Sequence, residues 1–547
     1  MNPIDYPYGS ARFADEMEVL RAFRDQGGVP FGFYNGRKLF HAKQAGMLLI
    51  GGAGSGKFTS VLAHLMDAPG RKGEPPRYAI FDPKRELRAV LEPYFAHIKA
   101  AVYEINPYLT HGVQGHRLSV LSHLTPQSPR LVADSRRAAR TLIAESGGGD
   151  ARFFEQKAQN WLDPLIRGLV HLDGGVSPSS LYELVGMIRS APEAWAEVSE
   201  LMEALGEPDL HVTFAEMRNM AEDASRTFES VMAEITNALA FMNDPRLQET
   251  FVASAQADFS LDVLCENSRQ SVFVFFVMPP EMTQQNAALI RQFFSTLRTL
   301  KQVRPEAPTL NLVIDEAAQL GAFPEIAEFY SIGRGFGLCP VCVYQDIGQI
   351  RKNLGPTGAM TLSASADLEV YLGGGISDLE TARMLSAKLG NQTLALEDHL
   401  VQHRAQRSRR EALLDAFSGR SDPLKTGSAL RALDYEQQHK RKLSRPLCTP
   451  EEILAMAQSQ ALVMPSGYGI PPFFAAKTPY YANKAYTGLY GPNPYFDREL
   501  SAVSVPGRWG GTSSLRVIRE TVPASHAHLP QYKHGEWQFI EGHPPQS

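Results

Sequence analysis

A glycine-rich stretch near the start of the chain, Gly51-Gly52-Ala53-Gly54-Ser55-Gly56-Lys57, constrains the fold more than any other feature. It follows a short apolar run at residues 46–50 and precedes residues 58–66, whose apolar positions have helical spacing. A strand, a glycine loop ending in lysine and a helix form a phosphate-binding P-loop, in which backbone N–H groups surround phosphate oxygens. Lys57 is then expected to reach the β- and γ-phosphates of a nucleotide. The alternative, a glycine-rich turn with a chance lysine, explains neither flank.

The position after Lys57 departs from the general pattern. A P-loop usually has Ser or Thr there, because the hydroxyl binds Mg²⁺. This chain has Phe58, and Thr59 supplies the next hydroxyl. We therefore expect nucleotide contacts from residues 51–59, and either Thr59 or a water in the place of the usual Mg²⁺ ligand.

The segment after the P-loop continues an alternation of strands and helices. A second strand at residues 78–81 ends in the polar sequence Asp82-Pro83-Lys84-Arg85-Glu86-Leu87. A helix over 85–98 and a strand over 100–104 complete a βαβαβ pattern, which is typical of a parallel α/β sheet. Polar residues at the carboxyl ends of such strands line the ligand crevice.

Helical periodicity replaces this alternation between residues 124 and 250. Helices are expected at 153–172, 181–188, 194–205 and 214–242. The same stretch has 20 Asp and Glu against 11 Lys and Arg, a net charge of −9. We therefore predict an acidic, all-α domain inserted into the α/β domain.

The strand pattern resumes at residues 271–278 and, after a helix at 286–301, at residues 310–314. The latter strand ends in Asp315-Glu316. In P-loop enzymes the first acid coordinates Mg²⁺, directly or through water, and the second activates the attacking water. A helix-capping acidic pair is the alternative, and the upstream P-loop argues against it.

Two polar residues flank the next strand, residues 338–344. Arg334 lies in a glycine-rich turn before it and is open to two interpretations, a phosphate-sensing finger or an ordinary surface arginine. Gln345 ends the strand and either orients the attacking water or is a polar strand terminus. Cys339 and Cys342 within the strand face opposite sides, so structural burial is expected rather than a redox or metal site. Further strands are expected at 368–372 and 461–464, with a helix at 378–389.

Charge and composition restrict the remaining possibilities. The formal net charge of −5 excludes a chain that is basic throughout, so contacts to nucleic acid must be local. Residues 402–445 are locally basic and are either a solvated loop or a phosphate-contacting one. The tail from residue 491 is rich in Gly, Pro, Ser and His and is expected to fold weakly. No apolar run reaches the ~18 residues of a membrane span.

Together these motifs resemble the TraG/TraD type of type IV coupling protein over residues 8–485. The matching segments, in chain order, are Gly9-Ser10-Ala11-Arg12, the P-loop, Asp82-Pro83-Lys84-Arg85-Glu86-Leu87, Ser225-Arg226-Thr227-Phe228, Ile314-Asp315-Glu316-Ala317, Gly333-Arg334-Gly335 with Gln345, and Arg445-Pro446-Leu447 with Glu451-Glu452-Ile453-Leu454. Several motifs in one order make the resemblance more specific than a P-loop alone.

The resemblance implies a RecA-like P-loop NTPase fold with a parallel-rich central sheet and an inserted all-α domain. It implies an ATPase that uses ATP and Mg²⁺, assembles as a hexamer and drives DNA or protein substrates into a type IV secretion channel. Lys57, Glu316, Arg334 and Gln345 would be catalytic, with Arg334 acting on a neighbour's nucleotide, and Asp315 and Thr59 would hold the metal. Expected partners are inner-membrane channel subunits, a relaxase or effector protein, and single- or double-stranded DNA.

Two departures from the family pattern shape the expectation. The family usually has N-terminal transmembrane helices and this sequence shows none, so we expect a cytoplasmic protein peripheral on the inner membrane. The acidic helical domain favours docking of a protein over nonspecific DNA binding. A nucleotide-gated docking platform with little motor activity and a DNA pump of the FtsK/HerA kind remain as alternatives.

We therefore expect five segments along the chain. They are an N-terminal segment (1–45), the first part of the nucleotide-binding domain (46–123), the all-α domain (124–250), the second part of the nucleotide-binding domain (251–490) and a tail (491–547).

Overall fold

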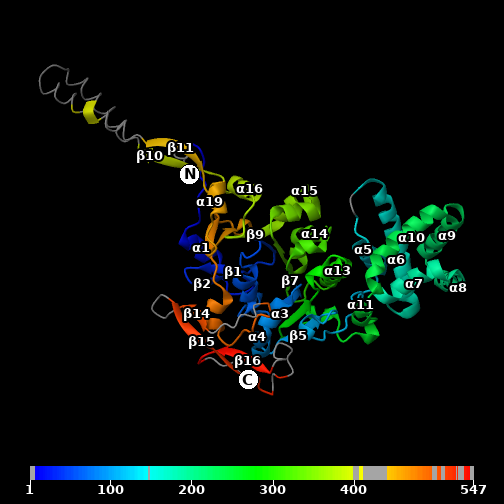
Figure 1. The fold of residues 1–547 in the computed structure, drawn as a ribbon. Helices are drawn as coiled ribbons and strands as arrows, with labels where there is room; N and C mark the ends of the chain where they lie inside the picture. The colour runs from blue at the N-terminus through cyan, green and yellow to red at the C-terminus, as the bar shows by residue number, and fades with distance from the viewer. Residues whose placement is uncertain are drawn as a thin grey trace.

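The computed structural model describes residues 7–145, 148–397, 406–408, 410, 440–495, 502–506, 512–524, 527 and 535–542. An 11-stranded sheet forms the centre of the molecule (Figure 1). The segment predicted as a basic loop, 402–445, lies mostly outside the described residues. Its last six residues and Pro446 form β11 (Lys440–Pro446), which pairs with β10 (Asn391–Glu397) in a separate antiparallel ribbon.

Seven adjacent strands of the sheet are parallel, as the βαβ pattern predicts. In spatial order they are β9 (Ala366–Leu372), β3 (Gly46–Ile50), β8 (Leu338–Tyr344), β7 (Leu310–Ile314), β4 (Arg77–Phe81), β6 (Val272–Phe276) and β5 (Ala101–Ile105). These strands are apolar and buried along almost their whole length because helices cover both faces of a parallel sheet. The carboxyl ends of β3, β4, β7 and β8 therefore meet at one edge, which we call the carboxyl edge.

Alternate residues of these strands supply two separate hydrophobic cores. Leu48, Phe81 and Ile314 belong to one core, whereas Leu49 and Val313 belong to the other. This alternation follows from the period of two that side chains have along a strand. The β3 and β7 strands are thereby fixed on both faces, which holds the loops at their carboxyl ends in place.

Four antiparallel strands extend the sheet beyond β9, and sequence analysis predicted only the first of them. They are β12 (Gln460–Met464), β13 (Phe473–Ala476), β1 (Val29–Tyr34) and β2 (Arg37–His41). The segment predicted as a separate N-terminal part thus contributes two strands to the sheet, and helix α1 (Glu16–Ala22) precedes them. The β1–β2 turn is Asn35-Gly36, both with positive φ, which is a strong hairpin signal.

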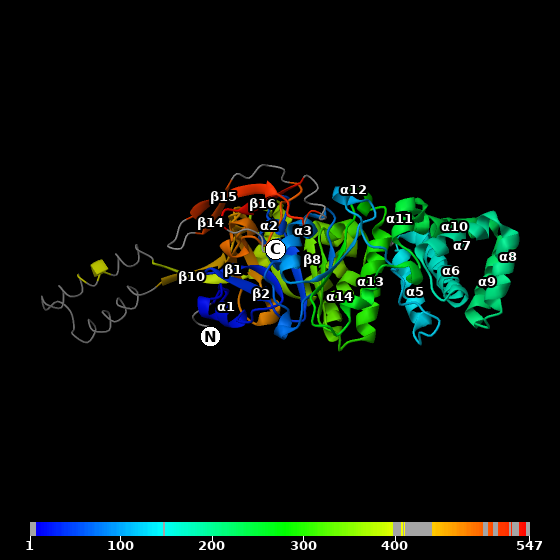
Figure 2. The same cartoon turned by 90° about the horizontal axis from the view of Figure 1, so that it is seen from below.

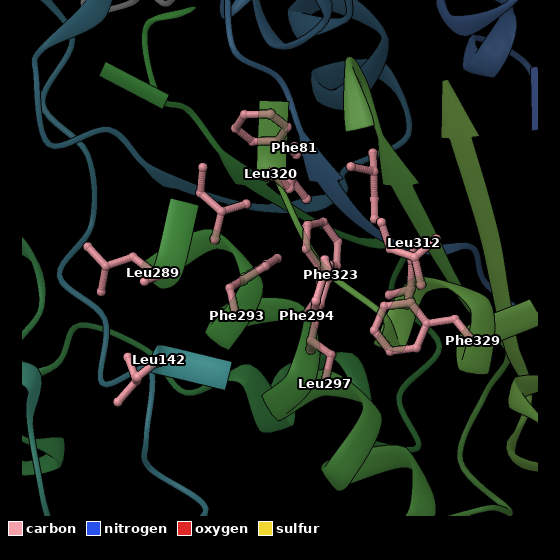
Figure 3. Close-up of a cluster of buried hydrophobic side chains, with 14 of the residues drawn as sticks. Phe81, Leu142, Leu289, Phe293, Phe294, Leu297, Leu312, Leu320, Phe323 and Phe329 are labelled. Atoms are coloured by element: carbon pink, nitrogen blue, oxygen red, sulfur yellow. The ribbon is translucent and has the colours of Figure 1, made fainter. Parts of the chain in front are cut away.

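Helix α13 (Ala287–Val303) packs under the sheet and is buried from Ala287 to Lys301. Figure 3 shows its Phe293, Phe294 and Leu297 in the apolar layer that also contains Phe81 and Leu312 of the strands. Leu142, the last residue of α5 (Leu131–Leu142), joins the same cluster. The helical region is therefore continuous with the main core at this point.

The inserted helical region extends to one side of the sheet in both views (Figures 1 and 2). After α5 it contains α6 (Gly149–Asp173), α7 (Pro178–Ser190), α8 (Pro192–Glu203), α9 (Pro208–Asp223), α10 (Ser225–Leu239) and α11 (Pro245–Thr250). Trp161 of α6 is completely buried at its centre, and its Nε1 donates a hydrogen bond to Glu216 of α9 (3.1 Å). The α/β class with an inserted all-α region agrees with the predicted fold.

Three predicted helices are broken in the structure. The helix expected over 58–66 is α2 (Lys57–Ser60) followed by a 3₁₀ turn, Leu62–Leu65, because Val61 leaves helical geometry. The helix over 85–98 divides into α3 (Glu86–Val90) and α4 (Glu92–His97). The helix over 214–242 divides at Ala224, whose φ of −140° and ψ of 50° end α9. Other helices not predicted include α14 (Glu325–Ser331), α15 (Ile347–Ser365) and α19 (Pro450–Leu454), whereas α16 (Leu379–Leu389) agrees with the helix expected at 378–389.

The tail is more structured than its composition predicts. A three-stranded antiparallel sheet forms in the tail from β14 (Ala502–Pro506), β15 (Thr512–Thr521) and β16 (Glu536–Ile540). The prediction of weak folding is therefore wrong for these residues. Figure 2 shows this sheet on the side where α2, α3 and α12 (Pro280–Thr283) lie. Among the helices that the structure describes, none is both long enough and apolar enough to cross a membrane.

Candidate nucleotide-binding site

The P-loop lies between β3 and α2 at the carboxyl edge, as predicted. Gly54 and Gly56 have φ values of 73° and 82°, which side chains other than glycine rarely adopt. The N–H of Gly52 donates to the carbonyl of Gly375 (2.8 Å), and a Cβ on Gly52 would lie 2.7 Å from that oxygen. The loop is therefore pressed against the glycine turn that follows β9, and Gly52 is required for this approach.

Lys57 stands at the start of α2 and bonds to its own loop. Its Nζ donates to the carbonyls of Gly51 (2.7 Å) and Gly52 (3.0 Å). Burial lowers the pKa of Lys57, while Asp315 and Glu316 act in the opposite direction. The ammonium is thus held over the loop and within electrostatic reach of both predicted acids.

The two acids follow β7, next to Lys57. Burial raises the pKa of Asp315 to about 7, and the neighbouring Glu316 and Asp82 add to the shift. Glu316 adopts a left-handed backbone conformation, with a φ of 57°. Its carboxylate accepts from Gln319 Nε2 and lies 4.0 Å from Lys84 Nζ. A left-handed backbone at a non-glycine residue is strained and is typical of functional positions.

Asp82, at the end of β4, adds a third carboxylate to this edge. It is 3% exposed and accepts from the N–H groups of Glu86 (3.1 Å) and Arg88 (2.8 Å), so it caps α3. Burial nevertheless raises its pKa to about 7. Sequence analysis identified the Asp82 motif without giving the residue a role in the site.

A cavity of about 180 Å³ connects the predicted catalytic residues. It is lined by Lys57, Glu316, Ala318, Gln319, Val343, Tyr344, Gln345 and Gln349. Gln345 follows β8, and its own N–H donates to Gln349 Oε1 (3.0 Å). The structure therefore brings Lys57, Glu316 and Gln345 together, and it adds Gln319 and Gln349, which sequence analysis missed because both lie in unremarkable polar stretches.

Phe58 is packed away as a structural residue. Its ring meets that of Tyr480 edge-on, with 5.8 Å between centroids. Thr59 is half-buried beside Gly56, and its hydroxyl would be 3.3 Å from a Cβ on that glycine. The hydroxyl is thus close to the loop, and its role as a metal ligand stays a prediction.

Arg334 lies at the opposite edge of the sheet. It belongs to a 3₁₀ turn, Gly333–Phe336, that precedes β8, and it is exposed. The seven residues of β8 separate it from Gln345, roughly 20 Å at the usual rise per residue. One chain therefore does not place Arg334 beside its own Lys57.

Two residues that bond to the P-loop, Lys477 and Gln458, were missed in the sequence analysis. Lys477 follows β13, and its Nζ donates to the carbonyls of Ser55 (2.6 Å) and Gly373 (2.8 Å). Gln458 Nε2 also donates to the loop, at the carbonyl of Gly54 (3.1 Å). No sequence pattern distinguishes Lys477 from a surface lysine, because β13 itself was not predicted.

The site has the chemistry that a magnesium nucleotide requires. Backbone N–H groups and Lys57 suit phosphate oxygens, and the half-buried carboxyl of Asp315 beside them suits a hard divalent cation. Both groups lie at the carboxyl edge, where the ligands of open α/β sheets bind. The residues present therefore fit both a nucleotide and Mg²⁺.

Comparison with solved structures gives the same fold. The unbound monoclinic form of the bacterial conjugative coupling protein TrwBdeltaN70 has a TM-score of 0.60 at 18% identity, over 86% of this chain and 92% of that chain. The plasmid coupling protein TrwB in complex with ADP and Mg²⁺ has 0.59 at 18%, over 86% and 93%. The same protein with the ATP analogue ADPNP has 0.59 at 19%, over 86% and 96%. Among curated proteins, none matches the sequence.

A family profile settles the affiliation that the motif order predicted. The profile described as Type IV secretory system Conjugative DNA transfer matches residues 11–501. That span includes the P-loop, the helical insertion, the Asp315-Glu316 pair and the residues of β13. The chain therefore belongs to the family of type IV secretory system conjugative DNA-transfer proteins.

Proposed function

We propose that this protein is an ATPase that couples substrates to a type IV secretion channel. The observation that carries the proposal is the convergence of Lys57, Glu316 and Gln345 on one cavity beside the P-loop. This arrangement places a cation for phosphate, a carboxylate for water and an amide for orientation within one small space. TrwB, which has this fold, has been solved with ADP and Mg²⁺ and with an ATP analogue.

The residues divide the work of hydrolysis among them. The N–H groups of Gly54 and Gly56 and the ammonium of Lys57 hold the phosphates. Asp315 and Thr59 hold Mg²⁺, which neutralises charge on the phosphates when bound. Glu316 takes a proton from the attacking water, and Gln345 orients that water.

Arg334 completes the site from a neighbouring subunit. Its exposed place at the opposite edge of the sheet supports action across an interface over action on its own nucleotide. An arginine supplied in trans stabilises the charge that develops on the γ-phosphate. We therefore propose that the active form is a ring, most simply a hexamer as in the resemblance described above.

The substrate is DNA joined to its relaxase, or an effector protein, delivered to channel subunits at the cytoplasmic face of the inner membrane. The family description, conjugative DNA transfer, supports this class of substrate. The decisive measurement is ATP turnover with and without single-stranded DNA, for the wild type and Lys57→Ala. We expect turnover in the wild type, stimulated by DNA, and none in the variant. Equal turnover in both would overturn the assignment.

A docking platform that hydrolyses little ATP is the second candidate, because the helical region is acidic. Helix α8 exposes Glu193, Glu197 and Glu200 on consecutive turns, with the apolar Leu201 60% exposed beside them. This surface suits a basic protein with an apolar anchor and repels the DNA backbone. Nucleotide binding without measurable turnover, with or without DNA and a basic substrate protein, would favour the platform over the motor.

A further inference from the structure

Lys477 is a buried cation that holds the P-loop from behind. Its side chain is 6% exposed, and its Nζ bridges the carbonyls of Ser55 and Gly373 at 2.6 and 2.8 Å. Strand β9 is parallel to β3, β12 is antiparallel to β9, and β13 is antiparallel to β12. Strand β13 therefore runs in the same direction as β3. The residue after β13 therefore reaches the carboxyl edge, where the P-loop lies.

The positive charge of Lys477 lacks a carboxylate partner within the described part of the chain. Burial is the one cause that shifts its pKa, which it lowers to about 8. At neutral pH the ammonium is thus mostly protonated, although burying an unpaired charge is unfavourable. An anion that binds in the P-loop compensates the buried positive charge beside it. The charge of Lys477 is therefore more favourable when the P-loop holds an anion.

The contact with Ser55 also acts through the backbone. The carbonyl of Ser55 and the N–H of Gly56 belong to one peptide group, so a cation bound to the oxygen polarises the N–H and makes it a stronger donor. Gly56 is one of the loop residues whose N–H groups face phosphate in a P-loop. The bond from Lys477 to Gly373 fixes the same loop to the turn that Gly52 contacts through Gly375.

We propose that Lys477 is a positioning residue for nucleotide binding, whose charge and two hydrogen bonds hold the P-loop in its phosphate-binding geometry. This inference rests on the proposed ATPase function and adds a residue from the far end of the family domain to the nucleotide site. Lys477 contacts backbone carbonyls of the loop and of the neighbouring turn, so its effect is on affinity.

Lys301 offers a matched control. It is also a fully buried lysine whose Nζ donates to two backbone carbonyls, those of Ala307 (2.8 Å) and Pro308 (3.2 Å). It lies at the amino edge of the sheet, near the turn before β8. Lys301→Met and Lys477→Met both remove a buried ammonium that is bound to two backbone carbonyls. They differ in the P-loop contact of Lys477, and in Glu306 and Glu74, whose charges partly oppose the lowering of the Lys301 pKa by burial.

The experiment measures the dissociation constant of a fluorescent ATP analogue, the steady-state kinetics, and the unfolding temperature without nucleotide. We expect both methionine variants to lower the unfolding temperature. Lys477→Met should weaken nucleotide binding at least about tenfold, the effect of losing a hydrogen bond to a charged group. Lys301→Met should bind as the wild type does. In Lys477→Met the KM for ATP should rise with kcat little changed, since uniform binding is lost.

Lys477→Gln separates the charge from the tether and serves if the methionine variant fails to fold. Glutamine keeps a donor but not the charge, so it should recover stability without recovering affinity. Wild-type affinity in Lys477→Met or Lys477→Gln, or equal weakening in Lys301→Met, overturns the inference. Lys57→Ala tests the underlying function in the same assay, because its retention of wild-type affinity would overturn the nucleotide site itself.

Discussion

The two edges of the parallel sheet hold charged side chains in opposite ways. At the amino edge the buried cations Arg71, Arg77 and Lys301 are bound to fixed backbone carbonyls, for example Arg77 to Ser268 (2.8 Å) and Arg71 to Lys43 (3.0 Å). At the carboxyl edge Asp82 is buried and Asp315 is half-buried, and the loss of water around each raises its pKa to about 7. The amino edge binds its cations to backbone carbonyls, and the carboxyl edge keeps its carboxylates close together at a cost.

This difference indicates that the amino edge serves stability and the carboxyl edge serves chemistry. A cation whose N–H donors already bind several backbone carbonyls has few donors free to bind a ligand. Burial disfavours the charged forms of the carboxylates and lysines at the carboxyl edge. A bound ligand of opposite charge stabilises these charged forms, and such an arrangement is common at active sites. Substitutions at the carboxyl edge should therefore change activity without unfolding the protein, and those at the amino edge the reverse, with Arg334 as an informative exception.

The largest effect is expected for Lys57→Ala. Its ammonium bonds only to carbonyls of its own loop, so its loss should leave the fold intact while removing the cation that holds the phosphates. We expect no measurable ATP turnover and no substrate transfer, with an unchanged circular dichroism spectrum. Hydrolysis at the normal rate would contradict the P-loop assignment.

Arg334→Ala tests the exception, an amino-edge residue that acts on chemistry. An arginine supplied in trans contributes about 10³–10⁵ in rate in related phosphoryl transfers, so turnover in assembled rings should fall by that order. Dispersed subunits should show no difference from the wild type at equal concentration.

Mixed rings distinguish trans from cis action. Combining Arg334→Ala with Lys57→Ala subunits should restore some activity, because certain interfaces pair an intact Lys57 with an intact Arg334. The ATPase rate is followed against the mixing ratio, with ring composition confirmed by mass. A rate fixed at the mutant baseline at every ratio would rule out action in trans.

Glu316→Gln should slow hydrolysis at least ~100-fold, the low end of general-base contributions. Glutamine keeps the size of the side chain and the strained backbone in place, so binding of an ATP analogue should not change. Single-turnover rates and analogue affinity are measured in parallel. Normal turnover would remove the general-base role from Glu316.

Arg71→Met should have the smallest effect on catalysis and a clear effect on stability. Its guanidinium donates to the carbonyls of His41 (3.2 Å) and Lys43 (3.0 Å) and to the amide of Asn311. Losing these bonds should lower the free energy of unfolding by about 2–3 kcal/mol, seen as a lower midpoint in urea. The rate per folded molecule should stay at the wild-type value. A slower rate with unchanged stability would break the distinction between the edges.

Much of the parallel core could be predicted because its strands are short apolar runs that are followed directly by glycine-rich or acidic motifs. Ile50 before the P-loop and Ile314 before Asp315 mark two strand ends directly. Helix breaks were harder, because Val61 and Ala224 are unexceptional residues whose backbone is set by packing. In the 3₁₀ turn after Val61, for instance, His64 forms hydrogen bonds with the hydroxyl of Tyr486 (2.9 Å) and the carbonyl of Thr478 (2.6 Å). Both partners lie more than 400 residues later in the chain.

The site divides in the same way. Lys57, Glu316 and Gln345 were found because each directly follows a predicted strand or loop motif. Lys477 was not found, because its role depends on β13, which pairs with β12 and was not predicted, and on a contact with Ser55 far away in the sequence. The Asn35-Gly36 turn is a local signal for the hairpin of β1 and β2, and it does not predict the neighbours of that hairpin.

The antiparallel extension also has a consequence for the order of folding during synthesis. Strand β1 waits for β13, and the P-loop waits for Lys477, which is separated from Ser55 by 422 positions. Domains generally fold from the N-terminus as they emerge from the ribosome, and contacts between distant residues form late. The nascent chain would therefore carry its P-loop through the synthesis of more than 400 further residues before Lys477 arrives. If Lys477 positions the P-loop as proposed, tight ATP binding would be acquired only after that residue has been made.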